Sequence, residues 1–199
     1  APKGKNYVWK GTGTLSGDMD LWKSQEGTLT IHSPLAYTGR TIVSEGTLEL
    51  HTTLPGALEL RAKGTLAGNP VLKGDVTFEP GLNYEGCRLS PGTEKEPFGT
   101  ITFDKGVTLT KGVYLQMDLQ TEGTVQNDYI KVNGNLALQG NTYLVLKPKE
   151  EKPAPGEYPL IGWTGECTGD LSRISVSGLK GLSYELKSVG KQIVLVINA

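Results

Sequence analysis

The stretch from Gly27 to Leu54, GTLTIHSPLAYTGRTIVSEGTLELHTTL, contains one short pattern twice, and this repetition decides the fold. In each copy apolar and polar residues alternate, which is the period of a β-strand with one buried face. Like side chains that recur in register are typical of a solenoid, in which each coil lies ~4.8 Å from the last. Placing Gly27 over Gly46 aligns the pairs Thr28/Thr47, Leu29/Leu48, Ile31/Leu50, His32/His51 and Leu35/Leu54.

The same unit, a glycine followed by a small or β-branched residue and alternating apolar positions, continues along the chain. Each copy predicts a short strand that opens at a turn glycine, and helical periodicity is absent. Short strands also suit a sandwich or a barrel, but neither has a use for an in-register repeat, so an all-β parallel β-helix is favoured. The further copies begin at Gly56, Gly64, Gly74, Gly99, Gly106, Gly112, Gly134 and Gly140, at uneven spacings that predict loops of differing length.

We expect one continuous domain in three parts. Residues 1–26 would form an N-terminal cap and first coil, 27–146 the β-helix coils, and 147–199 a charged loop followed by C-terminal capping strands. The stretch Lys147–Gly156 is charged and Pro-rich, which predicts an exposed loop. An antiparallel hairpin of residues 182–186 and 192–197 would then cover the C-terminal end. Candidates for the opposite cap are Tyr7, Trp9 and Trp22.

The charge balance argues against nucleic-acid and membrane partners. Lys and Arg number 20 against 21 Asp and Glu, a formal net charge of −1, and the basic residues do not cluster. A surface that tracks phosphates is therefore not expected. No apolar run reaches the ~18 residues that span a bilayer, so we expect no membrane insertion by this segment. Residues 1–20 contain no apolar signal-peptide core, and an export signal is expected to lie outside this chain.

The repeated units at Gly27–Ile31 and Gly46–Leu50, with Trp22 before the first and Tyr37–Val43 between the two, carry a family resemblance. They resemble the autotransporter-associated β-strand repeat, also called the passenger-associated transport repeat, of bacterial passenger domains. The resemblance implies a right-handed parallel β-helix in a bacterial extracytoplasmic protein, either secreted or at the cell surface. It spans roughly residues 22 to 197 and rests on Trp22–Ile31, Tyr37–Val43, Gly46–Leu50, Leu89–Gly92, Asp128–Leu136, Leu182–Leu186 and Ile193–Ile197.

Residues able to support catalysis or metal binding are sparse. The repeat places His32 and His51 at equivalent outward positions on neighbouring coils, but a usual zinc site needs three or four ligands and only Glu49 is nearby. Cys87 and Cys167 lack CxxC spacing. Asp128 precedes a strand, where Asp is usually a turn hydrogen-bonder. We therefore expect no catalytic residue, no metal site beyond the weak His32/His51 candidate, and no cofactor.

Outward aromatic and polar side chains are the remaining binding candidates, because sugar rings stack on aromatic faces. Tyr114, Gln116 and Asp118 alternate with inward Val113, Leu115 and Met117, and Tyr129 and Lys131 alternate with inward Ile130 and Val132. We expect a non-catalytic structural or adhesive module of a larger protein, whose partners are other domains of that protein. One alternative is an accessory glycan-binding module that contacts polysaccharide through these five outward residues. The other is a β-helical polysaccharide lyase or hydrolase.

Overall fold

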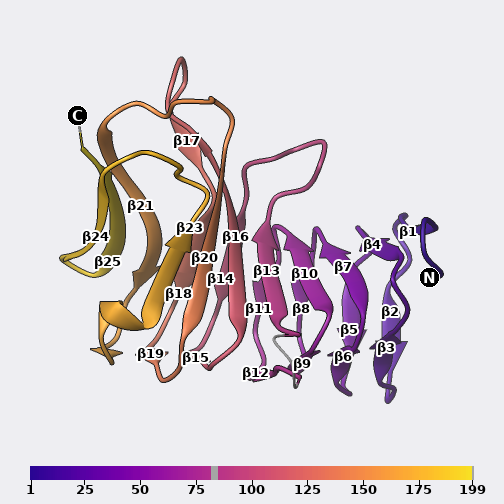
Figure 1. Cartoon of the computed structure of the whole chain (residues 1–199). Helices are drawn as coiled ribbons and strands as arrows, with labels where there is room; N and C mark the ends of the chain where they lie inside the picture. Colours follow the sequence, from indigo (N-terminus) through magenta and orange to yellow (C-terminus); the bar gives the residue numbers. More distant parts are fainter. Residues whose placement is uncertain (82–84, 199) are drawn as a thin grey trace.

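The computed structural model describes residues 1–81 and 85–198, and it is a parallel β-helix whose coils run side by side from the N-terminus to the C-terminus (Figure 1). Each complete coil supplies one short strand to each of three faces. The all-β parallel β-helix predicted from the repeats is confirmed. The right-handed winding stays a prediction, and it is the sense that parallel crossover connections almost always take. Within the described part of the chain, no helix is long and apolar enough to cross a membrane.

The first face is the longest sheet and continues from one end of the stack to the other. Its neighbouring strands in this path are all parallel, and the short strand β17 (Gln126–Asn127) joins β16 from the side in the antiparallel sense. The path consists of β1 (Asn6–Trp9), β4 (Thr28–Ile31), β7 (Gly46–Leu50), β10 (Gly64–Gly68), β13 (Cys87–Pro91), β16 (Val113–Gln120), β20 (Thr142–Pro148) and β23 (Ile174–Ser177).

The other two faces each change sheet partway along the stack. The second face holds β2 (Leu15–Gly17) and β5 (Leu35–Tyr37), then β8 (Thr53–Leu54), β11 (Val71–Leu72), β14 (Thr100–Phe103), β18 (Tyr129–Val132) and β21 (Gly156–Trp163). The third face holds β3 (Leu21–Lys23), β6 (Thr41–Val43), β9 (Leu58–Arg61) and β12 (Val76–Glu79), then β15 (Val107–Leu109), β19 (Leu136–Leu138) and β22 (Cys167–Thr168).

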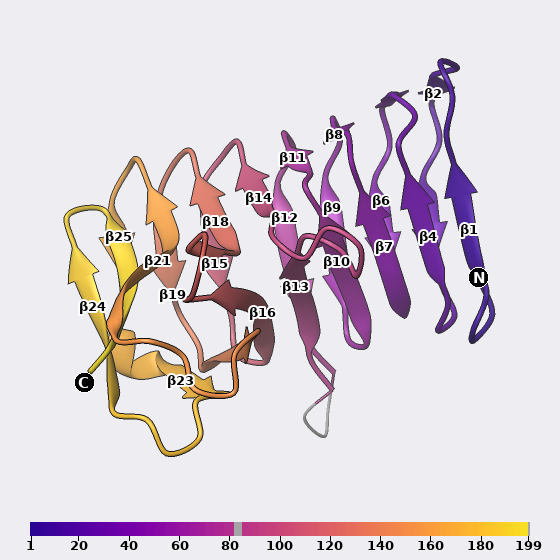
Figure 2. The same cartoon turned by 90° about the horizontal axis from the view of Figure 1, so that it is seen from above.

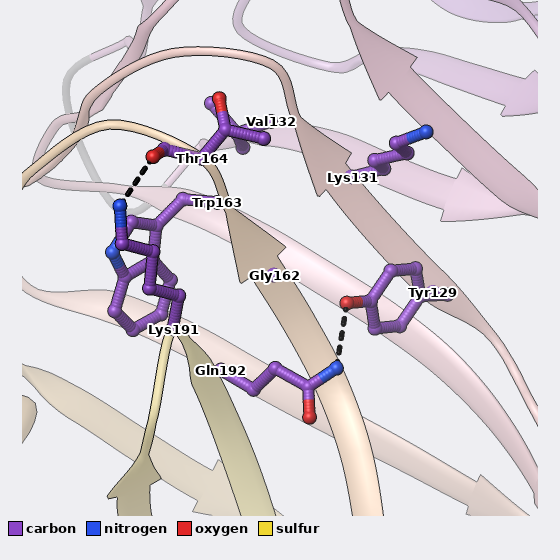
Figure 3. A pocket seen from close by; sticks show the side chains of 8 residues that line it. All are labelled: Tyr129, Lys131, Val132, Gly162, Trp163, Thr164, Lys191 and Gln192. Atoms are coloured by element: carbon purple, nitrogen blue, oxygen red, sulfur yellow. Dashed lines mark hydrogen bonds between the residues drawn. The ribbon is translucent and has the colours of Figure 1, made fainter.

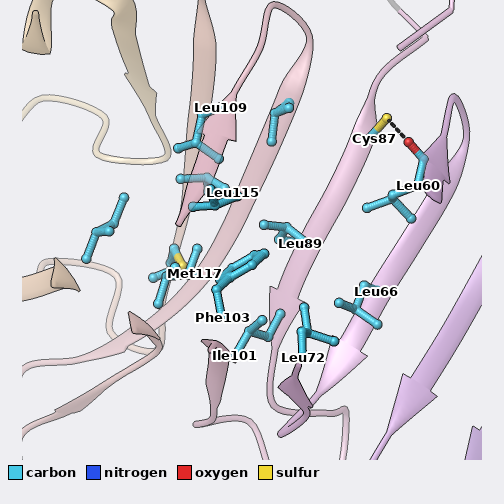
Figure 4. Close-up of a cluster of buried hydrophobic side chains, with 14 of the residues drawn as sticks. Leu60, Leu66, Leu72, Cys87, Leu89, Ile101, Phe103, Leu109, Leu115 and Met117 are labelled. Carbon is cyan, nitrogen blue, oxygen red and sulfur yellow. Dashed lines mark hydrogen bonds between the residues drawn. The ribbon is translucent and has the colours of Figure 1, made fainter. Parts of the chain in front are cut away.

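The predicted register is confirmed at the repeat that suggested the fold. Leu29 pairs with Leu48, which pairs with Leu66 on the next coil, and all three are buried. Such ladders place like side chains above one another, so each coil covers the apolar surface of the one before it. Figure 4 shows the middle of this core, where Leu66, Leu89 and Leu115 follow one another beneath the first face.

The coils lengthen toward the C-terminus. On the first face Thr28 pairs with Thr47, 19 residues further on, whereas Tyr143 pairs with Ser175, 32 residues further on. The added residues lie largely in longer strands such as β16 and β21 and in the loops between faces, as the uneven glycine spacing predicted. The C-terminal half therefore has a wider cross-section (Figure 1).

The predicted hairpin closes the C-terminal end. β24 (Tyr184–Val189) and β25 (Gln192–Ile197) are antiparallel, and β25 also pairs antiparallel with β21 on the second face. Figure 2 shows this hairpin at the end of the stack. Antiparallel strands interrupt the parallel ladder and bury Ile193, Leu195 and Ile197 against the core. The apolar end is thereby covered.

The strands differ from the expected three-part division at one boundary, and the expected first coil is present within residues 1–26. The coils continue past residue 146, because β21, β22 and β23 extend all three faces, and the exposed loop after β20 is an excursion within one coil. At the other end, β1 to β3 form a complete first coil. The expected N-terminal cap is not packed, since Tyr7, Trp9 and Trp22 are 53%, 40% and 61% exposed.

One buried charge holds a corner of an early coil. Lys23 ends β3, points inward and is 2% exposed. Its ammonium donates hydrogen bonds to the carbonyl oxygens of Ser24 (3.2 Å), Gln25 (2.6 Å) and Glu45 (2.7 Å). An ammonium has three donors and no acceptor, so these carbonyls satisfy it completely. Burial nevertheless lowers the pKa of Lys23, although the charge of Glu45 opposes that shift.

Candidate functional site

The first part of the predicted glycan set lies on β16, on the outward side of the first face. Tyr114 stacks on Tyr143 of the next coil, with ring centroids 4.7 Å apart and planes 19° apart. The Arg88 guanidinium lies 5.4 Å from the centroid of the Tyr114 ring. The faces of Tyr114 are thus occupied by neighbouring coils, and a sugar could stack on them only if this ladder opened.

The two polar residues of the predicted glycan set on β16 are also bound to side chains of a neighbouring coil. Gln116 accepts a hydrogen bond from Lys147 at 3.3 Å, and Asp118 forms an ion pair with Lys149 at 2.7 Å. Both lysines belong to the following coil, on β20 or just after it. Outward side chains on this face therefore bind one another along the stack, which is the usual behaviour of cross-strand pairs.

Tyr129 and Lys131 lie elsewhere, on β18 of the second face. They line a pocket of about 260 Å³ beside the C-terminal hairpin (Figure 3). The structure therefore divides the five predicted residues between two faces: Tyr114, Gln116 and Asp118 on one, Tyr129 and Lys131 on the other. The remaining lining residues are Val132, Gly162, Trp163, Thr164, Lys191 and Gln192.

The residue at the bottom of this pocket is a glycine, Gly162, which has no side chain. Lys131, Gly162 and Gln192 are direct partners across β18, β21 and β25, so they form one outward row in which the middle position has no side chain. A Cβ at Gly162 would overlap the Tyr129 hydroxyl. Glycine therefore lets the Tyr129 ring lie across the strand, with its hydroxyl over Gly162 and within hydrogen-bond distance of Gln192.

Hydrogen-bond donors dominate the pocket. Gln192 donates from its amide nitrogen to the Tyr129 hydroxyl at 3.2 Å, which fixes that oxygen as an acceptor and leaves its own proton for another partner. Lys191 donates to the carbonyl oxygen of Thr164. Lys131 and Lys191 are both exposed, and none of the described residues that line the pocket is acidic. The site therefore presents two ammonium groups to solvent without a lining carboxylate from the described part of the chain.

Most of this pocket was missed from the sequence, since only Tyr129 and Lys131 among its lining residues were predicted to bind a ligand. Trp163 and the Lys191–Gln192 pair lie more than 30 residues from Tyr129, on β21 and at the start of β25. Nothing in local alternation indicates that a hairpin strand returns to the second face. The one signal was Gly162, a glycine inside the apolar stretch YPLIGW, because an interior strand glycine often marks a bulge or a close approach.

The two histidines are stacked as predicted. The rings of His32 and His51 lie 4.4 Å apart at an interplanar angle of 11°. His51 also bonds Glu49 through its Nε2 atom at 3.0 Å. Across residues 1–81 and 85–198, no group of three potential metal ligands is found. The weak metal candidate therefore gains no third ligand in the described part of the chain.

Asp128 is the most buried of the acidic residues singled out from the sequence, with no exposed surface. Its two carboxylate oxygens accept the backbone N–H groups of Gly99 and Asp118, each at 2.8 Å. Burial raises the pKa of this carboxyl to about 7, although the two hydrogen bonds act in the opposite direction. Asp128 thus bonds across a coil corner, which is the turn role predicted for it.

The cysteines are unpaired. Cys87 is buried on β13 and donates its thiol proton to the Leu60 carbonyl oxygen at 2.9 Å, whereas Cys167 is exposed on β22. The two residues lie in different sheets on different faces.

Comparison with known proteins gives one partial similarity. The chain is 37% identical over 83 residues to the protein described as "Adhesin BmaC autotransporter" from Brucella suis biovar 1 (strain 1330). The aligned part is 40% of this chain but only 2% of that protein, so the chain spans a very small share of its relative. No family model matches the chain. The β-helix and this similarity together fit an autotransporter-like passenger, while the specific repeat type stays a prediction.

Proposed function

We propose that this chain is a non-catalytic structural or adhesive module of a larger bacterial protein that is secreted or held at the cell surface. The observation that carries the proposal is the first face, which runs as one parallel ladder from β1 to β23. Its similarity to a short part of an autotransporter adhesin supports the cell-surface setting. On this proposal, other domains of the same larger protein are its partners.

The architecture suits a rod that resists unfolding and proteolysis. Neighbouring complete coils are hydrogen-bonded to each other on at least two of the three faces, and inward ladders such as Leu29, Leu48 and Leu66 link the coils through a continuous core. Outward side chains are paired along the axis, as in the Arg88, Tyr114 and Tyr143 ladder. A stiff element of this kind can project a neighbouring domain away from a surface.

The proposal that the module is non-catalytic is supported by the interactions of its aspartate side chains. Asp128 is buried with both oxygens bonded to backbone, and Asp118 is paired with Lys149. Glycoside hydrolysis needs two carboxylates facing one cleft. The pocket on the second face is lined by lysines instead. The even charge balance of the whole chain supports the further proposal that nucleic acid is not a partner.

The experiment that tests the proposal deletes this segment from its parent protein. Residues 28–142 would be removed as whole coils, because Thr28 on β4 and Tyr143 on β20 are register equivalents on the first face. Attachment of the bacteria to a target surface would be measured along with surface display of the remaining protein. We expect attachment to fall while display is retained. Unchanged attachment, or release of reducing or unsaturated ends from polysaccharides by the purified chain, would contradict the proposal.

A glycan-binding role is the second candidate, and the pocket beside the hairpin favours it. Tyr129 and Trp163 supply aromatic surface, and Gln192 and the two lysines supply polar groups around a small hollow. Sugar sites combine these two kinds of group. A glycan array with the wild-type chain and a Tyr129→Ala variant tests this candidate, which predicts saturable binding that the variant loses.

A further inference from the structure

We infer that the pocket beside the C-terminal hairpin takes a single sugar residue that carries a carboxylate, such as a uronic acid unit of a polysaccharide. This inference rests on the glycan-binding candidate, because it names the ligand class of the same pocket. It is carried by the arrangement of Lys131, Gly162, Lys191 and Gln192 around the hollow (Figure 3).

The size of the pocket limits the ligand to about one ring. Its volume of about 260 Å³ is below the ~300–1,000 Å³ typical of sites for drug-sized molecules. The floor is the backbone of Gly162, and the buried Trp163 contributes to the wall. The hollow is open at the surface, so the rest of a polymer chain can lie outside while one residue enters.

The charge of the pocket favours a ligand whose sugar unit carries a carboxylate. Lys131 and Lys191 lie on opposite sides of the Gly162 floor (Figure 3). Lys191 uses one donor on the Thr164 carbonyl oxygen, and an ammonium has three. Two exposed cationic side chains border the pocket, and none of its described lining residues carries a carboxylate, so an anionic ligand is favoured by charge attraction.

The polar groups at the centre match a sugar better than a simple anion. The Tyr129 hydroxyl accepts from the Gln192 amide and keeps its own proton to donate. The amide oxygen of Gln192 points away from the other labelled residues of the pocket, so the Tyr129 hydroxyl is the polar group left to bind a ligand at the centre (Figure 3). A phenolic donor in a pocket that also has aromatic lining residues suits a sugar ring, which offers oxygen acceptors and apolar C–H surface, whereas an inorganic anion has no apolar face.

Calorimetric titration of the folded wild-type chain with three matched probes tests the inference. The probes are trigalacturonate, its fully methyl-esterified form and a neutral galactose trisaccharide. Esterification keeps the ring and removes the charge, so we expect binding of trigalacturonate and roughly tenfold weaker binding of the other two. This comparison needs no variant and stands even if a substitution prevents folding.

Variants locate the site. Lys131→Gln and Lys191→Gln should each weaken trigalacturonate binding roughly fivefold, as expected for partly exposed ion pairs. Gly162→Ala should weaken it further, because the added methyl group displaces the Tyr129 hydroxyl. Lys147→Gln is the matched control, since it removes one positive charge from β20 on the first face and should leave binding unchanged.

The possible failures are distinguishable. Equal binding of the acid, its ester and the neutral sugar overturns the inference of an acidic ligand but leaves the glycan-binding candidate intact. Binding of none of the probes or of a wider glycan array overturns both. Equal loss with Lys147→Gln and Lys131→Gln shows only diffuse charge attraction and overturns the pocket assignment.

Discussion

Substitution of Asp128 tests how the burial and the hydrogen bonds of its carboxyl group affect the free energy of unfolding. Asp128 lies at the corner that joins the first and second faces. The residue has no exposed surface, and its two oxygens accept the Gly99 and Asp118 N–H groups at 2.8 Å. In Asp128→Asn one acceptor becomes an NH2 group that faces a backbone N–H. An unpaired buried donor costs about 1–3 kcal/mol of unfolding free energy, which is the expected effect near pH 4.

The cost should then depend on pH. Burial raises the pKa of Asp128 from an ordinary 3.8 to about 7, so between these values the unfolded chain releases a proton that the folded chain keeps. The folded state thus binds more protons, and this carboxyl lowers the stability of the wild type as pH rises. The full difference corresponds to roughly 4 kcal/mol. Because the amide introduced by Asp128→Asn does not titrate, the disadvantage of the variant should disappear or reverse by pH 8.

Urea unfolding followed by tryptophan fluorescence at pH 4, 5, 6, 7 and 8 measures this difference. Subtracting the variant from the wild type cancels the contributions of other carboxyl groups. Asp75→Asn, at an aspartate whose side chain is 78% exposed, serves as the control and should give a small difference. A wild-type advantage over Asp128→Asn that stays constant with pH would refute the reasoning, because the carboxyl would then be ionised throughout.

Three further outcomes can be checked on the purified chain. Leu48→Asp should cost about 3–5 kcal/mol by placing a charge in the buried ladder, whereas Thr47→Asp on the outward side of the same strand should change the thermal midpoint little. Lys23→Met should cost about 1–3 kcal/mol in urea unfolding, because three backbone carbonyls lose their donor. A thiol reagent should modify Cys167 in the native chain and Cys87 only in denaturant, since Cys87 is fully buried and burial raises its pKa to about 11.

The coil, its inward ladders and its terminal hairpin could be predicted from the sequence alone. Alternation over residues 113–120 predicted the side chains that point inward, and every inward position there is buried. The repeat from Gly27 to Gly46 predicted the pairing of Leu29 with Leu48. These features depend on neighbours within a strand and on one repeated interval, and both can be counted along the chain.

The positions at which a coil turns, and therefore the face on which a residue lies, could not be predicted from the alternation or the repeat. Alternation distinguishes inward-pointing from outward-pointing side chains, but it does not show where a coil turns. Tyr114 and Tyr129 were therefore predicted to belong to one binding surface. The turn between β16 and β18 places them on different faces. That corner is held by Asp128 and Gly99, which are 29 positions apart in the chain.

The sequence by itself thus determined the alternation, the parallel stacking of the early coils and the near absence of catalytic motifs, because these depend on local period and composition. Only the tertiary structure decided that Lys131, Gly162 and Gln192 form one row, whose middle position leaves room for the Tyr129 hydroxyl. Strands β18, β21 and β25 meet through hydrogen bonds between segments far apart in the chain, and the last pair is antiparallel. A site built across such pairings depends on register, which is set by the whole stack of coils.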